Sequence, residues 1–355
     1  MDFHKKTKKM IVYGLFVAAS AYFLFIFILS RFEFSRSILF QQYQYGDLYE
    51  MALVRDFRFP RSSIPTHYSD VVLDDIDEAD IICFGDSFFV VHGDLFARML
   101  KEKTGKKVAS VNPLDVVEES NNPIVMLTEF GYEPQEHPTI MIWERVERGI
   151  TPLFVDPKIE RDEIFDKIEA AKTETISTSD IREDLTFVYT KNISTVFVQS
   201  LIKTGKFRVF GEISPLTPEY SLEPEMLFYY RAVEGYKRKM TESFIQKTAD
   251  NIALTSERVK ETFGITTVFM ACPNKYTVYG DFAAAPDYNE LIPLLVEALE
   301  ERGVITVDLT KTYDDYRKEH GDTSFLYYQS DTHWNELGTR IAVDEIVRVL
   351  EAVEE

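Results

Sequence analysis

Residues 79–99, ADIICFGDSFFVVHGDLFARM, contain the feature from which the fold can be predicted. The apolar run Ile81–Phe84 ends abruptly at Gly85-Asp86-Ser87, and a second apolar run with helical spacing follows. This pattern predicts a buried strand that ends in a polar turn and leads into a helix. In an open parallel sheet, such a turn lies at the carboxyl edge of the strands, where ligands bind.

The same alternation continues along the chain. Short runs rich in Val, Ile or Thr, bounded by turn or charged residues, predict further buried strands at 106–112, 139–146, 266–273 and 304–310. Helical patterns lie at 92–103, 240–263, 287–302 and 336–353. Strands that alternate with helices predict an α/β domain with a mainly parallel sheet and helices on both faces.

The composition restricts the class of protein. The chain has 355 residues, 45% of them hydrophobic, which suffices for one large α/β domain or two small ones. Its net charge of -20 argues against nucleic acid as a partner and disfavours strongly anionic surfaces, although local basic patches remain compatible with it. Cys83 and Cys272 lie in apolar, strand-like runs, which predicts two small buried side chains. No Cys/His cluster has zinc spacing, so we expect neither a metal nor a cofactor.

The N-terminus has the pattern of a membrane anchor. The lysine-rich tip MDFHKKTKKM precedes Ile11–Leu29, which carries no charge and is about as long as a bilayer-spanning helix. A cleaved signal peptide has a shorter apolar core, and Ser30-Arg31-Phe32 is a poor cleavage site. The charge asymmetry predicts a single-pass protein of the cell membrane, with a cytoplasmic N-terminus and an extracytoplasmic domain.

These patterns divide the chain into three parts. Residues 1–30 form the cytoplasmic tip and transmembrane anchor, 31–78 a membrane-proximal connector, and 79–355 the α/β domain. An insertion at about 151–238 breaks the alternation, first with a charged stretch and then with short runs that contain prolines. We expect this inserted segment to lie as a cap beside the ligand edge of the sheet.

Ser87 meets two requirements of an acyl-transfer nucleophile. Its hydroxyl lies at the ligand edge, and the backbone N–H groups of the following turn can stabilise an oxyanion. Gly85 permits a tight turn or the close approach of a substrate. The alternative is structural, because Ser and Asp are also common capping residues at helix N-termini.

Asp331 and His333 supply the groups that such a serine needs. A histidine is the usual general base near neutral pH, and a carboxylate on its other ring nitrogen fixes its tautomer. An acid two residues before a histidine can turn back to Nδ1 and leave Nε2 free to face Ser87. The alternative is a solvated loop histidine with Asp331 as a helix cap.

Gly85-Asp86-Ser87 and Asp331-x-His333 resemble the SGNH (GDSL-like) hydrolase superfamily. Residues 140–150, 272–282 and 327–338 are similar to motifs of the alginate O-acetyltransferase group, the AlgX/AlgJ-like and DHHW-type proteins. The resemblance covers roughly 79–150 and 240–350. It implies a three-layer α/β/α sandwich, O-acetylation of an extracellular polysaccharide, and catalytic roles for Ser87, His333 and Asp331.

The chain departs from this family pattern in two ways. The Asp-x-His motif precedes the serine in the alginate enzymes, whereas here the serine comes first, as in ordinary SGNH hydrolases. The usual Gly and Asn oxyanion blocks are also not evident. Donors beyond the Ser87 amide therefore stay open, and Asn112, at the end of the second strand, is a candidate.

Further polar residues follow the third and fourth strands. Arg148 can bind an anionic or hydroxyl-rich ligand, or it can pair with Glu144 and brace the loops. Lys275 and Tyr279 lie at the same predicted edge, where a tyrosine can stack on a sugar ring or anchor a loop. Arg148, Lys275 and Tyr279 are thus substrate candidates.

The resemblance implies an acetyl-serine on Ser87, with a sugar hydroxyl as the acceptor. It also implies a membrane-bound O-acyltransferase as acetyl donor, because acetyl-CoA is absent outside the cell. A membrane anchor fits this partnership. Two alternatives remain: a polysaccharide deacetylase or esterase with the same triad, and a non-catalytic subunit of a polysaccharide secretion complex.

Overall fold

The computed structural model describes residues 45–61, 76–111, 121–152 and 193–354, with scattered positions between 14 and 24. The chain divides into two compact units. The larger one comprises Ser62–Thr175 and Thr217–Glu355, and the smaller one Met1–Arg61 and Ile176–Leu216. The predicted three-part division of the chain stays a prediction.

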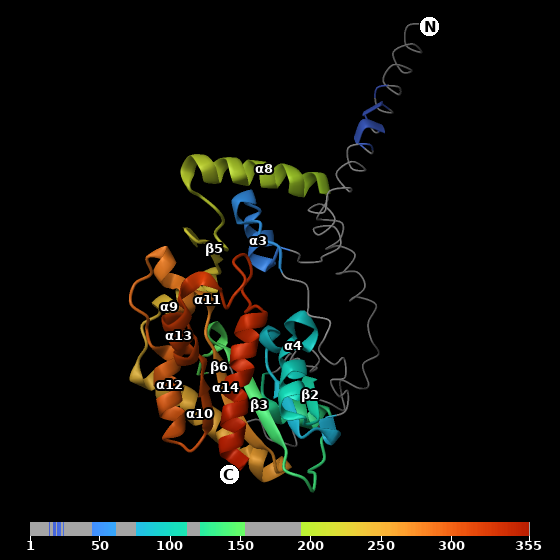
Figure 1. Ribbon diagram of the computed structural model, residues 1–355, viewed down its shortest axis with the longest axis vertical. Coiled ribbons are helices and arrows are strands. Elements are labelled where there is room, and N and C mark those ends of the chain that lie inside the picture. The colour runs from blue at the N-terminus through green and yellow to red at the C-terminus, as the bar shows by residue number, and fades with distance from the viewer. Residues whose placement is uncertain are drawn as a thin grey trace, which may run out of the picture. The chain divides into compact units, whose positions relative to one another are not determined.

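The larger unit is built on a five-stranded parallel sheet with the order β2-β1-β3-β6-β7 (Figure 1). The strands are β1 (Ile81–Phe84), β2 (Val108–Val111), β3 (Ile140–Val146), β6 (Thr266–Cys272) and β7 (Ile305–Asp308). Each lies within a stretch that the apolar runs predict to be a strand. Because all five run in the same direction, their carboxyl ends share one edge of the sheet.

Helices cover both faces of this sheet, because successive strand residues point into two different cores. Ile81 and Cys83 belong to one core, and Ile82 and Phe84 to the other. The first core is closed by α4 (Ser87–Thr104), α13 (Leu309–His320) and α14 (Glu336–Glu354), and the second by α5 (Pro123–Glu129), α10 (Glu242–Phe263) and α12 (Leu291–Glu300). A mainly parallel α/β fold with helices on both faces is thereby confirmed.

Helix α13 was not expected from the sequence, which predicts a strand as far as residue 310. The strand ends at Asp308 because its side chain accepts the backbone N–H groups of Thr310 and Lys311 and so caps a new helix. Asp308 is both the last residue of β7 and the N-cap of α13. The pattern of apolar residues therefore does not reveal where the strand ends and the helix begins.

Smaller elements surround the carboxyl edge of the sheet. They are the hairpin of β4 (Glu219–Leu222) and β5 (Glu225–Phe228), α9 (Tyr230–Lys237), α11 (Lys275–Tyr279), and the 3₁₀ turns η4 (Glu147–Gly149), η5 (Gly280–Ala283) and η6 (Gly321–Thr323). The 3₁₀ turn η2 (Ile76–Glu78) precedes β1 and lies at the amino end of the strands. The Leu227 N–H donates to the Gln329 carbonyl, which joins the hairpin to the loop that carries His333. Part of the predicted inserted segment thus borders this loop, while residues 153–192 lie outside the described residues.

The smaller unit contains α3 (Asp47–Ala52), η1 (Arg55–Phe57) and α8 (Ile193–Phe210). Helix α8 contacts η1 through the rings of Phe57 and Phe207 and through an ion pair between Arg208 and Asp56, and it contacts α3 through a hydrogen bond from Lys203 Nζ to the Met51 carbonyl. No helix among the described residues combines the length and the apolar character that crossing a bilayer requires. The predicted span at 11–29 lies largely outside the described residues, as do most of the connector and Asn112.

Candidate active site

Asp86 fixes the turn between β1 and α4. Its Oδ1 accepts the N–H of Phe88 at 3.2 Å, which caps the helix, and its Oδ2 accepts the N–H of Val146 at 3.0 Å. Asp86 therefore ties the start of α4 to the end of β3. It leaves Ser87 as the first residue of the helix, at the carboxyl edge of the sheet.

Gly85 has a further reason for being glycine, besides the predicted tight turn or close approach of a substrate. A Cβ added there would lie 2.6 Å from Glu144 Cβ and 2.9 Å from Phe89 Cδ2. The Oε2 atom of Glu144 lies underneath the turn and accepts the Asp86 N–H at 2.8 Å. The glycine makes room for this carboxyl group, which is 1% exposed.

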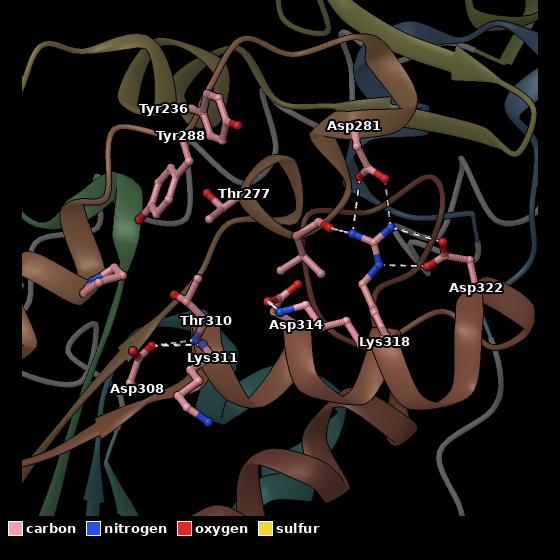
Figure 2. A pocket seen from close by; sticks show the side chains of 13 residues that line it. Tyr236, Thr277, Asp281, Tyr288, Asp308, Thr310, Lys311, Asp314, Lys318 and Asp322 are labelled. Carbon is pink, nitrogen blue, oxygen red and sulfur yellow. Dashed lines mark hydrogen bonds and ion pairs between the residues drawn. The ribbon is translucent and has the colours of Figure 1, made fainter.

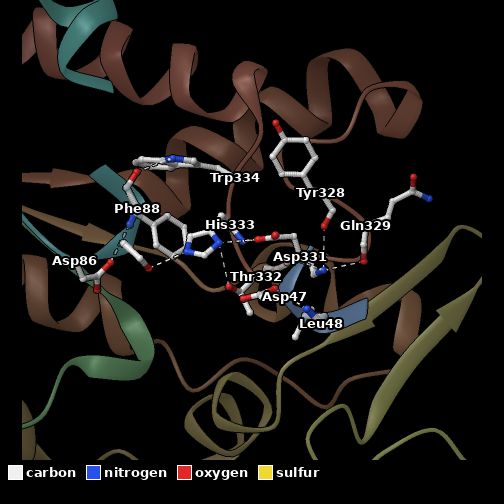
Figure 3. Close-up of polar contacts among 12 residues, drawn as sticks. Asp47, Leu48, Asp86, Phe88, Tyr328, Gln329, Asp331, Thr332, His333 and Trp334 are labelled. Carbon is white, nitrogen blue, oxygen red and sulfur yellow. Dashed lines mark hydrogen bonds and ion pairs between the residues drawn. The ribbon is translucent and has the colours of Figure 1, made fainter. Parts of the chain in front are cut away.

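Ser87, His333 and Asp331 form a continuous chain of hydrogen bonds (Figure 3). His333 Nε2 lies 2.8 Å from Ser87 Oγ, and His333 Nδ1 lies 2.6 Å from Asp331 Oδ1. The same Asp331 oxygen also accepts the His333 backbone N–H at 2.9 Å. The carboxylate therefore fixes the imidazole ring with Nε2 turned toward the serine. The structure brings together the three residues predicted to be catalytic, although their chemical roles stay a prediction.

A buried lysine holds the loop that carries Asp331. Lys275 begins α11, directly after β6, and its Nζ donates to the carbonyls of Tyr328, Gln329 and Asp331 at 3.0, 2.9 and 2.7 Å. An ammonium has three donors, and all three carbonyls lie within hydrogen-bond distance of this one. Lys275 thus shapes the backbone on which Asp331 and His333 lie.

Aromatic packing fixes the other side of this loop. The indole N–H of Trp334 donates to the Phe88 carbonyl at 3.1 Å, and the Trp334 ring stacks on Phe96. The Phe88 ring lies 5.2 Å from the His333 ring, measured between centroids. Residues next to the serine and next to the histidine therefore pack on each other, which keeps the two loops at a constant separation.

The substrate roles predicted for Lys275 and Tyr279 do not fit their positions. Lys275 is 3% exposed and Tyr279 is fully buried, where its hydroxyl accepts the Leu326 N–H at 2.8 Å. Burial also raises the pKa of Tyr279 to about 12. Both side chains belong to the internal support of the histidine loop. The sequence placed them at the correct edge but could not show which way they point.

Arg148 is placed differently. It is partly exposed, donates to Asn274 Oδ1 at 3.2 Å, and lies over the rings of Phe88 and Tyr229, 5.7 Å from each centroid. The alternative pairing with Glu144 is not formed, because Glu144 lies under the serine turn. Of the three substrate candidates Arg148, Lys275 and Tyr279, Arg148 is therefore the one that borders the site and is partly exposed.

Glu147 is a supporting residue that the sequence analysis missed. Its Oε2 accepts the N–H and the side-chain amide of Asn274 and the hydroxyl of Thr277, while its Oε1 accepts the hydroxyl of Tyr288. Burial raises the pKa of this carboxyl group, and the hydrogen bonds oppose that shift. The sequence ERVERG offered several equivalent charged residues, and nothing in it marked this one as buried.

Thr277 and Tyr288, which both bind Glu147, also line a cavity of about 780 Å³ (Figure 2). Asp308, at the end of β7, and Arg317, on α13, also line it. Arg317 is paired with Asp281 and Asp322. None of the lining residues belongs to the Ser87–His333–Asp331 chain, so this cavity is separate from the candidate active site.

The oxyanion position is only partly defined. The Ser87 N–H belongs to the first turn of α4, and no acceptor for it is found among the described residues. A helix N-terminus offers such groups to an anion. The second predicted donor, Asn112, lies outside the described residues. Of the two predicted oxyanion donors, the Ser87 amide and Asn112, the structure thus describes only the Ser87 amide.

Residues 225–355 match the family described as SGNH hydrolase-like domain, acetyltransferase AlgX. This match confirms the predicted resemblance to that family over residues 225–355 and indicates an acetyltransferase- or esterase-type function. It covers less than half of the chain and includes Lys275, Asp331 and His333, whereas Ser87 lies before it. No curated protein and no solved structure matches the chain significantly.

Proposed function

We propose that the chain is a membrane-anchored, extracytoplasmic O-acetyltransferase that moves acetyl groups onto a polysaccharide through an acetyl-serine at Ser87. The observation that carries this proposal is the hydrogen-bonded chain from Ser87 through His333 to Asp331. A serine, an imidazole and a buried carboxylate in this order form the arrangement that activates a hydroxyl for acyl transfer.

In the first step, the Ser87 oxygen attacks the carbonyl carbon of the acetyl donor while its proton passes to His333 Nε2. The Ser87 N–H stabilises the negative oxygen that develops on the carbonyl. The bond to the leaving group then breaks, and His333 returns the proton to that group. Asp331 stabilises the imidazolium that exists between these events.

In the second step, a sugar hydroxyl attacks the acetyl-serine. His333 takes the proton of this hydroxyl, the new ester bond forms, and the bond between acetyl and Ser87 breaks. The proton then returns from His333 to the Ser87 oxygen. Arg148, which is partly exposed and borders Phe88, is placed to orient a hydroxyl-rich acceptor.

The partners of this reaction follow from its location. Outside the cell the acetyl group has to be delivered through the membrane, so we propose a membrane-bound O-acyltransferase as donor. The uncharged run at 11–29 would anchor the chain beside that partner.

The nucleophile is tested by replacing Ser87 with Ala and offering the purified chain an activated acetyl ester. We expect the covalent acetyl adduct, detected by intact mass, to disappear together with ester turnover, which should fall at least ~10³-fold because no other group can attack. Ser324→Ala, on a serine exposed at the surface, is the matched control and should retain both signals. An adduct that persists in Ser87→Ala would remove the nucleophile assignment.

The acceptor distinguishes transfer from hydrolysis. The same acetyl ester is supplied with and without an oligosaccharide, and the mass of the products is measured. An acetylated sugar supports the transferase, whereas free acetate formed at the same rate in both reactions supports the esterase alternative. If neither product appears and a serine-directed probe leaves Ser87 unlabelled, the non-catalytic alternative is favoured.

A further inference from the structure

Helix α8 has an unusual distribution of polar and apolar residues. The side that packs within the smaller unit includes Ser200, Thr204 and Phe207, all at most 8% exposed. Thr204 Oγ1 accepts the Arg55 N–H at 3.2 Å, and Lys203 Nζ donates to the Met51 carbonyl at 3.1 Å. The helix is therefore held on α3 and η1 largely by polar groups, where an ordinary surface helix presents its apolar stripe.

The opposite side of α8 is apolar and faces solvent. Val209 is 72% exposed, Ile202 is 55% exposed and Leu201 is 46% exposed. Because a helix turns about 100° per residue, Leu201, Gly205 and Val209 form one row, with Ile202 beside it. An uncovered stripe of this kind on a soluble surface marks a contact site.

The charged residues within α8 are all cationic, and one of them, Arg208, also pairs with Asp56 of η1. The chain carries a net charge of -20, but the charged residues between positions 185 and 211 are only Lys191, Lys203, Lys206 and Arg208. In the helical arrangement, Lys206 and Arg208 flank the apolar row on its two sides. Long cationic side chains in this position can extend to phosphate groups while the apolar row is buried between lipids.

We propose that α8 lies in the membrane–water interface, with Leu201, Ile202 and Val209 among the lipids and the flanking cations at anionic headgroups. The position of the helix along the chain agrees with this, given the proposed anchor. Helix α3, on which α8 packs, begins 18 residues after the end of the apolar run 11–29, a distance of at most ~60 Å for an extended chain.

The cations also show that α8 lies on the bilayer and does not cross it, because three of them occur within six residues. A second membrane contact would restrict rotation about the N-terminal anchor. It would thereby hold the smaller unit at a fixed depth, which a single flexible tether cannot do.

The experiment uses the full chain in vesicles of phosphatidylglycerol and phosphatidylethanolamine. A thiol-reactive, environment-sensitive dye is placed at Val209→Cys or Ile202→Cys. The native Cys83 and Cys272 are fully buried, and burial raises the pKa of both thiols, so the dye reacts with the introduced cysteine. We expect the emission to shift to the blue and to be quenched by nitroxide-labelled lipid.

Leu254→Cys is the matched control, because Leu254 is an apolar residue of α10 with 37% exposure. A dye there should show neither the shift nor the quenching. Lys206→Glu should weaken the quenching at Val209 at low salt, and high salt should reduce this difference because it screens the attraction to the headgroups. The two α8 positions report independently, so a variant that fails to fold does not end the test.

Dyes at Val209 and Ile202 that behave like the dye at Leu254 would overturn the proposal. It would also be overturned if these positions became protected only in cell membranes that contain other proteins, since the contact would then be a protein. The lipid-quenching result does not depend on whether the chain catalyses acyl transfer. Val209→Cys should give the same quenching when Ser87 is replaced by Ala, whatever the enzymatic assays show.

Discussion

The two loops that meet at the candidate active site are held by groups of opposite kind. On the serine side, the carboxyl groups of Asp86 and Glu144 accept backbone N–H groups of the turn and of β3. On the histidine side, the ammonium of Lys275 donates to three backbone carbonyls. Each loop is thus fixed by a charged side chain that complements the backbone groups it presents.

The difference follows from the local structure of each loop. The start of α4 presents N–H groups without helical partners, so acceptors stabilise it. The loop before α14 turns carbonyl groups inward, so a donor stabilises it. Asp86 also fills an ordinary capping position, whereas Lys275 is a fully enclosed ammonium. We therefore expect the histidine side to be more sensitive to substitution than the serine side.

Lys275→Met should have the largest effect. It leaves one buried and two partly buried carbonyls without their donor, which we expect to lower the free energy of unfolding by about 3 kcal/mol. Displacement of Asp331 and His333 should lower kcat for an activated acetyl ester about 100-fold, with a smaller change in KM. Chemical denaturation and steady-state kinetics measure the two quantities.

Lys239→Met is the control, because Lys239 is exposed and the same charge is removed. It should change neither stability nor kcat appreciably. The change in kcat relative to KM is a readout that separates loss of positioning from general destabilisation. An unchanged kcat in Lys275→Met would show that Lys275 does not position the imidazole.

Asp86→Ala should have an intermediate effect. It removes the helix cap at Phe88 and the acceptor for the Val146 N–H, which together should cost about 2 kcal/mol of stability. Asp86→Asn keeps an oxygen for the cap and should recover about half of this loss, because asparagine caps helices almost as well. If Asp86→Ala lowered the free energy of unfolding more than Lys275→Met does, the serine side would be the more sensitive of the two loops, contrary to our expectation.

The sequence predicted the larger unit well because its signals are local. Each strand of the parallel sheet is a short apolar run, and α10, α12 and α14 have clear helical periods. The prediction failed for α13, since Asp308 ends a strand and caps a helix at the same residue. Periodicity averages over several residues and cannot resolve a change that occurs at one.

The candidate site was predictable only in part, for a physical reason. Ser87, Asp331 and His333 were identified because acyl transfer requires those groups at the edge of a sheet. Lys275 was placed at that edge, but its direction depends on the carbonyls of a loop 53–56 residues away. Such long-range hydrogen bonds leave no pattern in the sequence near the lysine.

Of the substitutions discussed, Glu144→Gln should change the free energy of unfolding least at low pH. At higher pH its effect on that free energy should depend on pH. Burial, with a further contribution from the charge of Asp86, holds the pKa of Glu144 well above its usual range. Above the ordinary glutamate pKa of about 4.3, the unfolded chain loses this proton while the folded chain keeps it. The contribution of Glu144 to stability is therefore complete below that pH and is lost as pH rises toward the folded pKa.

The glutamine variant removes this dependence, since its amide stays neutral at every pH. We expect it to match the parent chain within about 0.5 kcal/mol near pH 4 and to become relatively more stable as pH rises. Buried Glu147, with its own raised pKa, contributes the same slope to both proteins, so it cancels from the difference. A constant difference in denaturation free energy between pH 4 and 8 would show that Glu144 is ionised beneath the serine turn. The serine loop and the histidine loop would then both be held by a buried charge, that of Glu144 and that of Lys275. The two loops would differ only in the sign of this charge.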